Sequence, residues 1–312
     1  MDVDAIALNF NPTTLFILNL VLGFVMFGVA LDMTIGDFAS IKDRPRSFLI
    51  GMACQFFILP AITLLLVLWL QPAPSVGLGM ILVASCPGGN ISNFFTYLGK
   101  GNTALSVSMS AVSTAAAMFM TPFNFAFWGG MVPGADAILA EINVTFWQMA
   151  QTIFILMLIP LAIGMFIRHR FPEIANKMVR PMKIFSMVFF LAFVAVALAG
   201  NWQNFMDSIN IVFLTVLLMN AFAIALGYFS ATAFRLPESD RRAVALEVGI
   251  QNSGLGLILI FNFFGGLGGM AIIAGWWGIW HIITGYAMGY IWSRVNTNQD
   301  NINHIPGGSL QT

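Results

Sequence analysis

One carboxylate, Glu247, lies inside a long apolar stretch of this 312-residue chain. The surrounding sequence, EVGIQNSGLG at 247–256, adds two side-chain amides, a hydroxyl and three glycines. A charged side chain deep in a bilayer costs at least a few kcal/mol, so its presence there indicates function. Carboxylate, amide, hydroxyl and carbonyl oxygens are the ligands that hard cations prefer. The stretch therefore predicts a cation site or a proton carrier; the alternative is a protonated glutamate that only hydrogen-bonds a neighbouring helix.

A second polar stretch, SCPGGNISN at 85–93, lies in an earlier apolar segment. Pro87 removes a backbone donor and clashes with the preceding turn, and glycines are poor helix formers. Unwound backbone is tolerated in membranes only where protein or water surrounds it, and in secondary transporters it forms substrate and ion sites. We therefore expect broken helices near 85–93 and 247–256, entering from opposite faces as an inverted repeat requires and crossing near the midplane. For the PGG sequence alone, a simple kink is the alternative.

Other polar side chains stand in apolar surroundings. Ser106 and Ser110 are four residues apart, so they share one helix face and offer further hydroxyl oxygens. Gln55 and His281 are isolated in their segments. The alternatives are a tight helix–helix interface for the serines, an interhelical hydrogen bond for Gln55, and a satisfied buried group for His281.

These groups must be positioned by membrane helices. The chain is 59% hydrophobic and 8% charged, whereas soluble domains have about 25% charged residues. A spanning helix needs roughly 20 apolar residues, and nine segments qualify: 13–31, 47–70, 76–98, 103–128, 146–167, 184–200, 210–234, 241–264 and 270–292. The sequence therefore predicts an all-α polytopic membrane protein with an external N-terminus at 1–12, a membrane domain at 13–292 and a polar cytoplasmic tail at 293–312.

The basic residues orient these helices. With nine helices, all 13 Lys and Arg residues fall in connections on one face, Arg241 and Arg242 at the boundary with the segment that begins at residue 241. They are Lys42, Arg44, Arg46, Lys100, Arg168, Arg170, Lys177, Arg180, Lys183, Arg235, Arg241, Arg242 and Arg294. The positive-inside rule then places the N-terminus outside and the C-terminus in the cytoplasm, in a plasma (inner) membrane. The net charge of zero gives no argument for nucleic-acid binding.

Four stretches resemble the bile acid:sodium symporter family. They are FVMFGVALDMTIGDF at 24–38, CPGGNISN at 86–93 with YLGKGNTALSVSMSAVST at 97–114, and EVGIQNSG at 247–254. The resemblance runs from about residue 23 to residue 292. Because the pattern begins so early in the chain, no room remains for the extra first helix of the ten-helix bacterial members. The arrangement therefore looks like the nine-helix members.

The resemblance implies a fold with panel and core domains, inverted repeats and two crossing discontinuous helices, with two sodium ions behind the crossing. A first sodium site would use Ser92, Asn93, Ser106, Ser110 and Glu247. A second would use Gln55, Glu247, Gln251 and the backbone carbonyls of Val248 and Ile250. The substrate would be contacted by Asn90, Asn252 and His281.

The leading hypothesis is a secondary active transporter that carries an organic anion, bile acid-like or a smaller keto or hydroxy acid, together with sodium by alternating access. A proton-coupled transporter using Glu247 is the alternative. A channel is less expected because no unbroken polar stripe follows several helices. An enzyme is not expected, since it needs an acid pair, a Ser/His pair or a metal motif such as HExxH, and Glu247 and His281 are the only candidates, with no metal-ligand spacing between them. The expected partners are the anion, sodium and lipid, with no cofactor and no obligate protein partner.

Overall fold

A computed structural model describes residues 12–142, 144–200 and 202–295. Within these ranges the chain forms helices and one isolated β-bridge, with no β-sheet. The all-α class is therefore confirmed. The expected external segment 1–12 lies outside the described residues except for its last residue, and only 293–295 of the expected tail are described.

The first part of the chain forms α1 (Pro12–Ala30), α2 (Ala39–Asp43), α3 (Pro45–Ala53), a π-helical turn (Cys54–Ile58), α4 (Leu59–Leu70), α5 (Pro74–Ser85), α6 (Ile91–Leu98) and α7 (Thr103–Gly129). The second part forms α8 (Asp136–Ile142), α9 (Phe146–Ile153), a second π-helical turn (Phe154–Leu158), α10 (Ile159–Arg170), α11 (Pro172–Gly200), α12 (Trp202–Ala233), α13 (Glu238–Gly249), α14 (Ser253–Phe263) and α15 (Gly268–Arg294). Proline occupies the first position of α1, α3, α5 and α11, where its fixed φ favours a helix start and its missing N–H is not needed.

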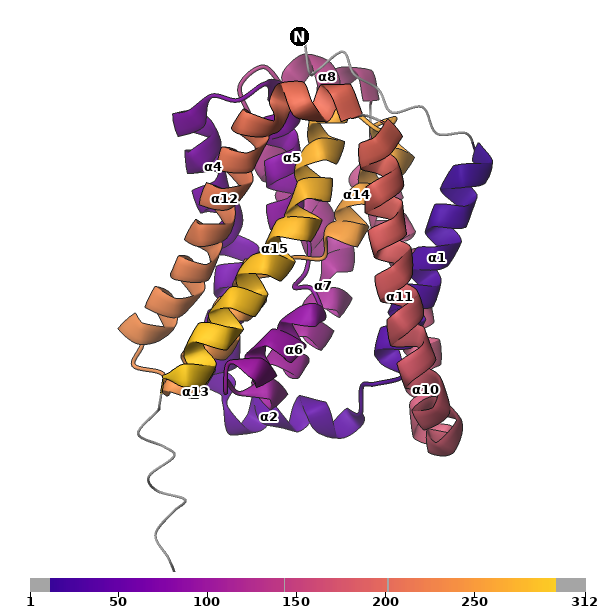
Figure 1. Cartoon of the computed structure of the whole chain (residues 1–312), viewed down its shortest axis with the longest axis vertical. Coiled ribbons are helices and arrows are strands. Elements are labelled where there is room, and N and C mark those ends of the chain that lie inside the picture. The colour runs from indigo at the N-terminus through magenta and orange to yellow at the C-terminus, as the bar shows by residue number, and fades with distance from the viewer. Residues whose placement is uncertain (1–11, 143, 201, 296–312) are drawn as a thin grey trace, which may run out of the picture.

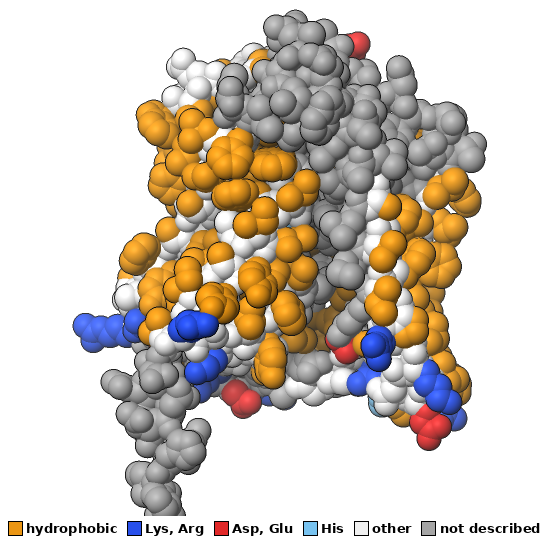
Figure 2. Space-filling view, in the orientation of Figure 1, with side chains coloured by type: hydrophobic (Ala, Val, Ile, Leu, Met, Phe, Trp, Pro, Cys, Tyr) orange, Lys and Arg blue, Asp and Glu red, His pale blue; other side chains and the backbone are white. Residues whose placement is uncertain are grey.

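The surface is that of a membrane protein. Among the residues that the structure describes, four helical stretches are long and apolar enough to cross a bilayer: Pro45–Leu70, Thr103–Gly129, Phe146–Arg170 and Val212–Ala233. Figure 2 shows hydrophobic side chains over the middle of the molecule and Lys and Arg side chains gathered near its lower end. The count of nine spanning helices stays a prediction.

Two helices begin earlier than the apolar pattern indicates. The helix expected at 184–200 begins at Pro172, and the helix expected at 210–234 begins at Trp202. Lys and Arg are good helix formers, so the charged stretch before residue 184 continues the helix instead of forming a loop. The apolar pattern marks the apolar part of each helix, and not its backbone ends.

Two interrupted helices cross inside the bundle. Helix α5 ends at Ser85 and α6 begins at Ile91, while α13 ends at Gly249 and α14 begins at Ser253. Both breaks fall inside 85–93 and 247–256. In Figure 1, α5 and α14 occupy the upper half of the bundle, and α6 and α13 the lower half.

Backbone hydrogen bonds join the two breaks. The Gly89 N–H donates to the Ile250 carbonyl at 2.7 Å, and the Asn252 N–H donates to the Pro87 carbonyl at 2.9 Å. Gly88 faces Gln251 in an antiparallel β-bridge. The unwound backbone thus satisfies part of its own hydrogen-bonding capacity within the protein, as the apolar surroundings demand.

Helices α1, α10 and α11 form a column at the right of Figure 1. The backbones of α1 and α10 approach each other closely, since a Cβ atom at Gly164 in α10 would lie 2.8 Å from the Phe27 carbonyl oxygen of α1. Asn19 of α1 and Asn262 of α14 exchange two side-chain hydrogen bonds, of 3.1 and 2.9 Å, so this column also contacts the second broken helix. The division into panel and core domains and the inverted repeat stay predictions.

Candidate functional site

Three serine hydroxyls surround the Glu247 carboxylate. Ser92 Oγ lies 2.5 Å from Oε2, Ser106 Oγ lies 3.2 Å from Oε2, and Ser110 Oγ lies 2.8 Å from Oε1. Asn93 Oδ1 lies 2.8 Å from Ser106 Oγ and 3.3 Å from Ser110 Oγ. The glutamate and the serines are buried. The structure therefore brings together all five residues that the family resemblance assigned to the first sodium site.

This cluster has more oxygen atoms in contact than hydroxyl hydrogens to place between them. Each serine has one hydroxyl hydrogen, yet Ser106 and Ser110 each contact both Glu247 and Asn93 oxygens. Ser92 Oγ also lies 3.5 Å from the oxygens of Ser106 and Ser110. Oxygens at right angles around a hard cation, at about 2.4 Å from it as in calcium sites, are about 3.4 Å apart. The separations of 3.2–3.5 Å in this cluster are close to that value, whereas those of 2.5–2.8 Å are direct hydrogen bonds.

Three helices supply these groups. Ser92 and Asn93 belong to the first turn of α6, Ser106 and Ser110 to successive turns of α7, and Glu247 to α13. Residue 88 must be small, because a Cβ atom at Gly88 would overlap Glu247 Oε1. The glycine at the first break thus leaves the space that the carboxylate occupies.

A second polar cluster lies around Gln55 and Gln251. Gln55 Nε2 donates to Gln251 Oε1 at 2.7 Å and to the Cys86 carbonyl at 2.8 Å. Gln251 Nε2 donates to the Val248 carbonyl at 2.7 Å. The Ile250 carbonyl accepts the Gly89 N–H and keeps a second lone pair. The residues assigned to the second sodium site therefore lie around the crossing.

Gln55 reaches the crossing from a π-helical turn. The turn Cys54–Ile58 precedes Pro60, whose ring would clash with the carbonyl four residues earlier in a regular α-helix. The same arrangement recurs at Phe154–Leu158 before Pro160. Single π-helical turns of this kind frequently occur at functional sites.

Two further buried side chains bind carbonyls at the breaks, and the sequence analysis missed both. Asn220 of α12 donates to the Gly249 carbonyl at 2.7 Å, and Thr121 of α7 donates to the Ser85 carbonyl at 2.8 Å. Asn220 Oδ1 has no hydrogen-bond partner among the described residues. An isolated amide in an apolar segment was the signal used for Gln55, and it applies equally to Asn220.

The residues expected to contact substrate are more dispersed. Asn90 is partly buried at the start of α6 and makes no side-chain capping bond. Asn252 Oδ1 accepts the Leu255 N–H at 3.0 Å and so caps α14. His281 is buried in α15, and its Nδ1 atom has no hydrogen-bond partner in the described part of the chain.

Comparisons with known proteins identify the family of this chain. Residues 19–208 match the model of the sodium bile acid symporter family. A Bacillus subtilis protein named uncharacterized sodium-dependent transporter YocS is 31% identical over 88% of this chain and 82% of its own length. The human ileal sodium/bile acid cotransporter is 28% identical over 77% of this chain and 67% of its own.

A rice chloroplastic protein named probable sodium/metabolite cotransporter BASS2 is 29% identical over 78% of this chain, which spans only 56% of that protein's length. The family model covers more than half of the chain, and its members are transporters and not enzymes. This chain therefore belongs to the sodium bile acid symporter family of membrane transporters.

Proposed function

We propose that this protein imports a small organic anion together with two sodium ions by alternating access. The observation that carries the proposal is the buried cluster of oxygens around Glu247, at the crossing of two broken helices. Family membership and the names of the similar proteins support sodium as the coupling ion. The inward sodium gradient and the membrane potential, worth about 2.3 kcal/mol per charge per 100 mV, would drive uptake.

The first ion is proposed to bind among Ser92, Asn93, Ser106, Ser110 and Glu247. The second is proposed to bind among Gln55, Glu247, Gln251 and the carbonyls of Val248 and Ile250. One carboxylate would thus serve both ions, with neutral oxygens completing each site. The N-terminus is proposed to lie outside and the C-terminus in the cytoplasm of the plasma membrane.

The substrate is proposed to bind on the other side of the crossing, where Asn90 and Asn252 precede α6 and α14. The N-terminal ends of these helices carry partial positive charge, which favours an anionic group. His281 is proposed as a third contact. Sodium ions that order the unwound backbone would also order both asparagines, which lowers the cost of binding the anion.

The first test is a thermal-stability screen of the purified protein against organic anions, with sodium or with potassium. A ligand at 100 times its Kd stabilises the folded state by about 2.7 kcal/mol, so the cognate anion should raise the melting temperature by several degrees in sodium only. The Asn90→Ala variant should keep the sodium-dependent shift and lose the anion-dependent one. Stabilisation that is equal in potassium would contradict sodium coupling.

Loss of one neutral ligand should weaken sodium dependence without eliminating transport. In Gln55→Ala and Ser110→Ala, each lost contact is worth about 0.5–1.5 kcal/mol, so we expect the sodium half-saturation of uptake to rise by roughly 2- to 12-fold. Ser113→Ala is the matched control, because in the described part of the chain this buried hydroxyl donates to the Ser110 carbonyl of its own helix and to no other group. Unchanged half-saturation in both test variants would mean that these side chains only pack helices.

A further inference from the structure

Two buried charges lie in the first turns of α13, before the turn that carries Glu247. Asp240 is 0% exposed and Arg242 is 1% exposed. The sequence analysis placed Arg242 in a basic connection, whereas the structure buries it within the helix. A buried charge destabilises a protein unless it is paired and hydrogen-bonded. The partners of these two side chains show what their burial achieves.

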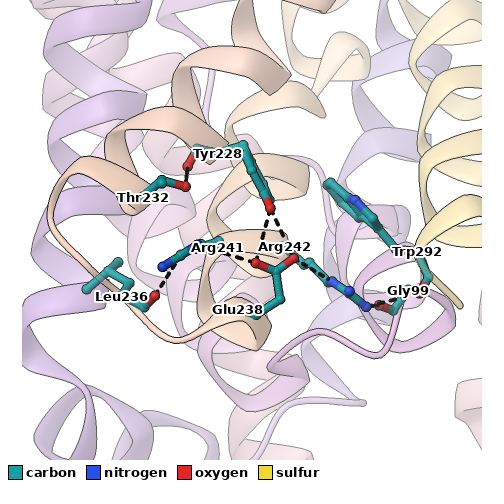
Figure 3. A network of polar contacts seen from close by, with 8 residues as sticks. All are labelled: Gly99, Tyr228, Thr232, Leu236, Glu238, Arg241, Arg242 and Trp292. Carbon is teal, nitrogen blue, oxygen red and sulfur yellow. Dashed lines mark hydrogen bonds and ion pairs between the residues drawn. The ribbon is translucent and has the colours of Figure 1, made fainter. Parts of the chain in front are cut away.

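Arg242 connects α13 to the ends of two other helices. Its Nη1 atom donates to the Gly99 carbonyl at 2.9 Å and to the Trp292 carbonyl at 3.0 Å (Figure 3). Its Nε atom donates to Glu238 Oε1 at 3.0 Å, which balances the charge. Gly99 is the residue that ends α6, and Trp292 lies in the last turn of α15. One guanidinium therefore holds α6 and α15 against α13.

Asp240 connects α13 to two further helices. Its carboxylate accepts the Ser47 hydroxyl of α3 at 2.6 Å and the side-chain amide of Asn102 at 2.8 Å. Asn102 also caps α7 through the Leu105 N–H, and its own N–H donates to the Ser239 carbonyl at 2.9 Å. The carboxylate therefore fixes the start of α7 and the start of α3 relative to α13.

The helices held by these two residues are those that carry the proposed ion ligands. Helix α3 leads into the turn with Gln55, α6 carries Ser92 and Asn93, α7 carries Ser106 and Ser110, and α13 carries Glu247. We propose that Asp240 and Arg242 are positioning residues for sodium: they hold the ligand-bearing helices at the spacing that the ions require. This inference rests on the proposed sodium coupling.

If Asp240 and Arg242 only stabilised the fold, their substitution would have a different effect on sodium binding. Loss of a general structural contact lowers the melting temperature and leaves the ion affinity of the folded protein unchanged. Loss of a positioning contact lets the ligand-bearing helices shift, so ordering them on binding becomes costly and sodium affinity falls. Substrate affinity at saturating sodium should change little, because the bound ions restore the arrangement.

The test compares adjacent arginines. Arg242→Lys keeps the charge but loses the forked geometry that reaches Gly99 and Trp292 together. Arg241→Lys is the matched control, because the partners that the structure describes for the Arg241 side chain are the Leu236 carbonyl, Glu238 and Tyr228 (Figure 3). None of these partners belongs to α3, α6 or α7, and none is a proposed ion ligand. Sodium binding is measured by calorimetry on the purified full chain, and substrate half-saturation by uptake into vesicles at saturating sodium.

We expect Arg242→Lys to weaken sodium binding by about tenfold, which is the lower end of the loss in affinity when a supporting contact at a metal site is removed. The substrate half-saturation at saturating sodium should stay within about twofold of the wild-type value. Arg241→Lys should match the wild type in both. A lowered melting temperature in Arg242→Lys with unchanged sodium affinity would overturn the inference.

A milder variant covers the case in which Arg242→Lys does not fold. Ser47→Ala removes one hydroxyl from Asp240, and it should weaken sodium binding by about two- to fivefold, as expected for one hydrogen bond. Unchanged sodium affinity in this variant would also overturn the inference. A wild-type protein that binds no sodium would instead overturn the proposed function, and this inference with it.

Discussion

Uptake by the Glu247→Gln variant is expected to fall to the level measured without sodium. The carboxylate is the one charged group in a cluster otherwise made of hydroxyls and an amide. Leaving a buried charge without its partner costs about 3–5 kcal/mol, which corresponds to a loss of sodium affinity of more than about 100-fold. The measurement is uptake of the anion found by the stability screen into vesicles with an inward sodium gradient.

The fold should survive this substitution. Glutamine has nearly the same volume as glutamate, and the three serine hydroxyls can donate to its oxygen or accept from its nitrogen. The melting temperature in sodium-free buffer should therefore stay within a few degrees of the wild-type value. Glu247→Asp, which keeps the charge and retracts it by one methylene, should retain sodium stimulation with weaker affinity. Wild-type uptake by Glu247→Gln would remove this residue from the mechanism.

The second large effect is expected from Gly88→Ala, which adds a single methyl group at the first break. That methyl would overlap Glu247 Oε1, so the carboxylate has to leave its place among the serines. Over-packing a well-filled site costs about 1–3 kcal/mol. If this free energy is lost from the sodium-bound state, in which the carboxylate must lie among the serines, sodium affinity falls by roughly 5- to 150-fold. Sodium titration by calorimetry measures it directly.

Two comparisons isolate the cause. Gly256→Ala adds the same methyl group in α14, where its nearest neighbour would be Cys86 Sγ at 3.7 Å, and it should leave sodium binding unchanged. The double variant Gly88→Ala/Glu247→Asp shortens the carboxylate and so makes room for the methyl group. It should bind sodium better than Gly88→Ala alone, as expected for residues in contact. Equal effects of Gly88→Ala and Gly256→Ala would refute a specific clash with Glu247.

The breaks could be predicted from sequence because their causes are local. Pro87 and the glycines beside it disfavour helix wherever they occur, and so does the glycine-bearing run after Glu247. The polar side chains nearby drew attention because a membrane segment otherwise excludes them. That Ser92, Ser106 and Glu247 lie together depended on the family resemblance, since spacing along a chain does not place one helix against another.

The supporting residues could not be predicted in this way. Asp240 and Arg242 lie where an apolar segment meets a basic connection, so the composition indicates solvent-exposed charges. Only the packing of α3, α6, α7 and α15 around α13 buries them. The extra turns at the start of α11 escaped prediction for a related reason, because hydropathy reports the apolar part of a helix and not its backbone hydrogen bonds.

The crossing of the broken helices also determines when the site comes into existence during synthesis. Ser92 and Glu247 are separated by 155 positions, and ribosomes add about 5–20 residues per second, so the first break precedes Glu247 by roughly 8–30 s. Throughout that interval the Pro87 carbonyl and the Gly89 N–H lack the partners that the second break provides. The nascent first half must therefore keep these groups hydrated or otherwise bonded until the second half inserts, and a chain truncated before α13 would remain in that incomplete state.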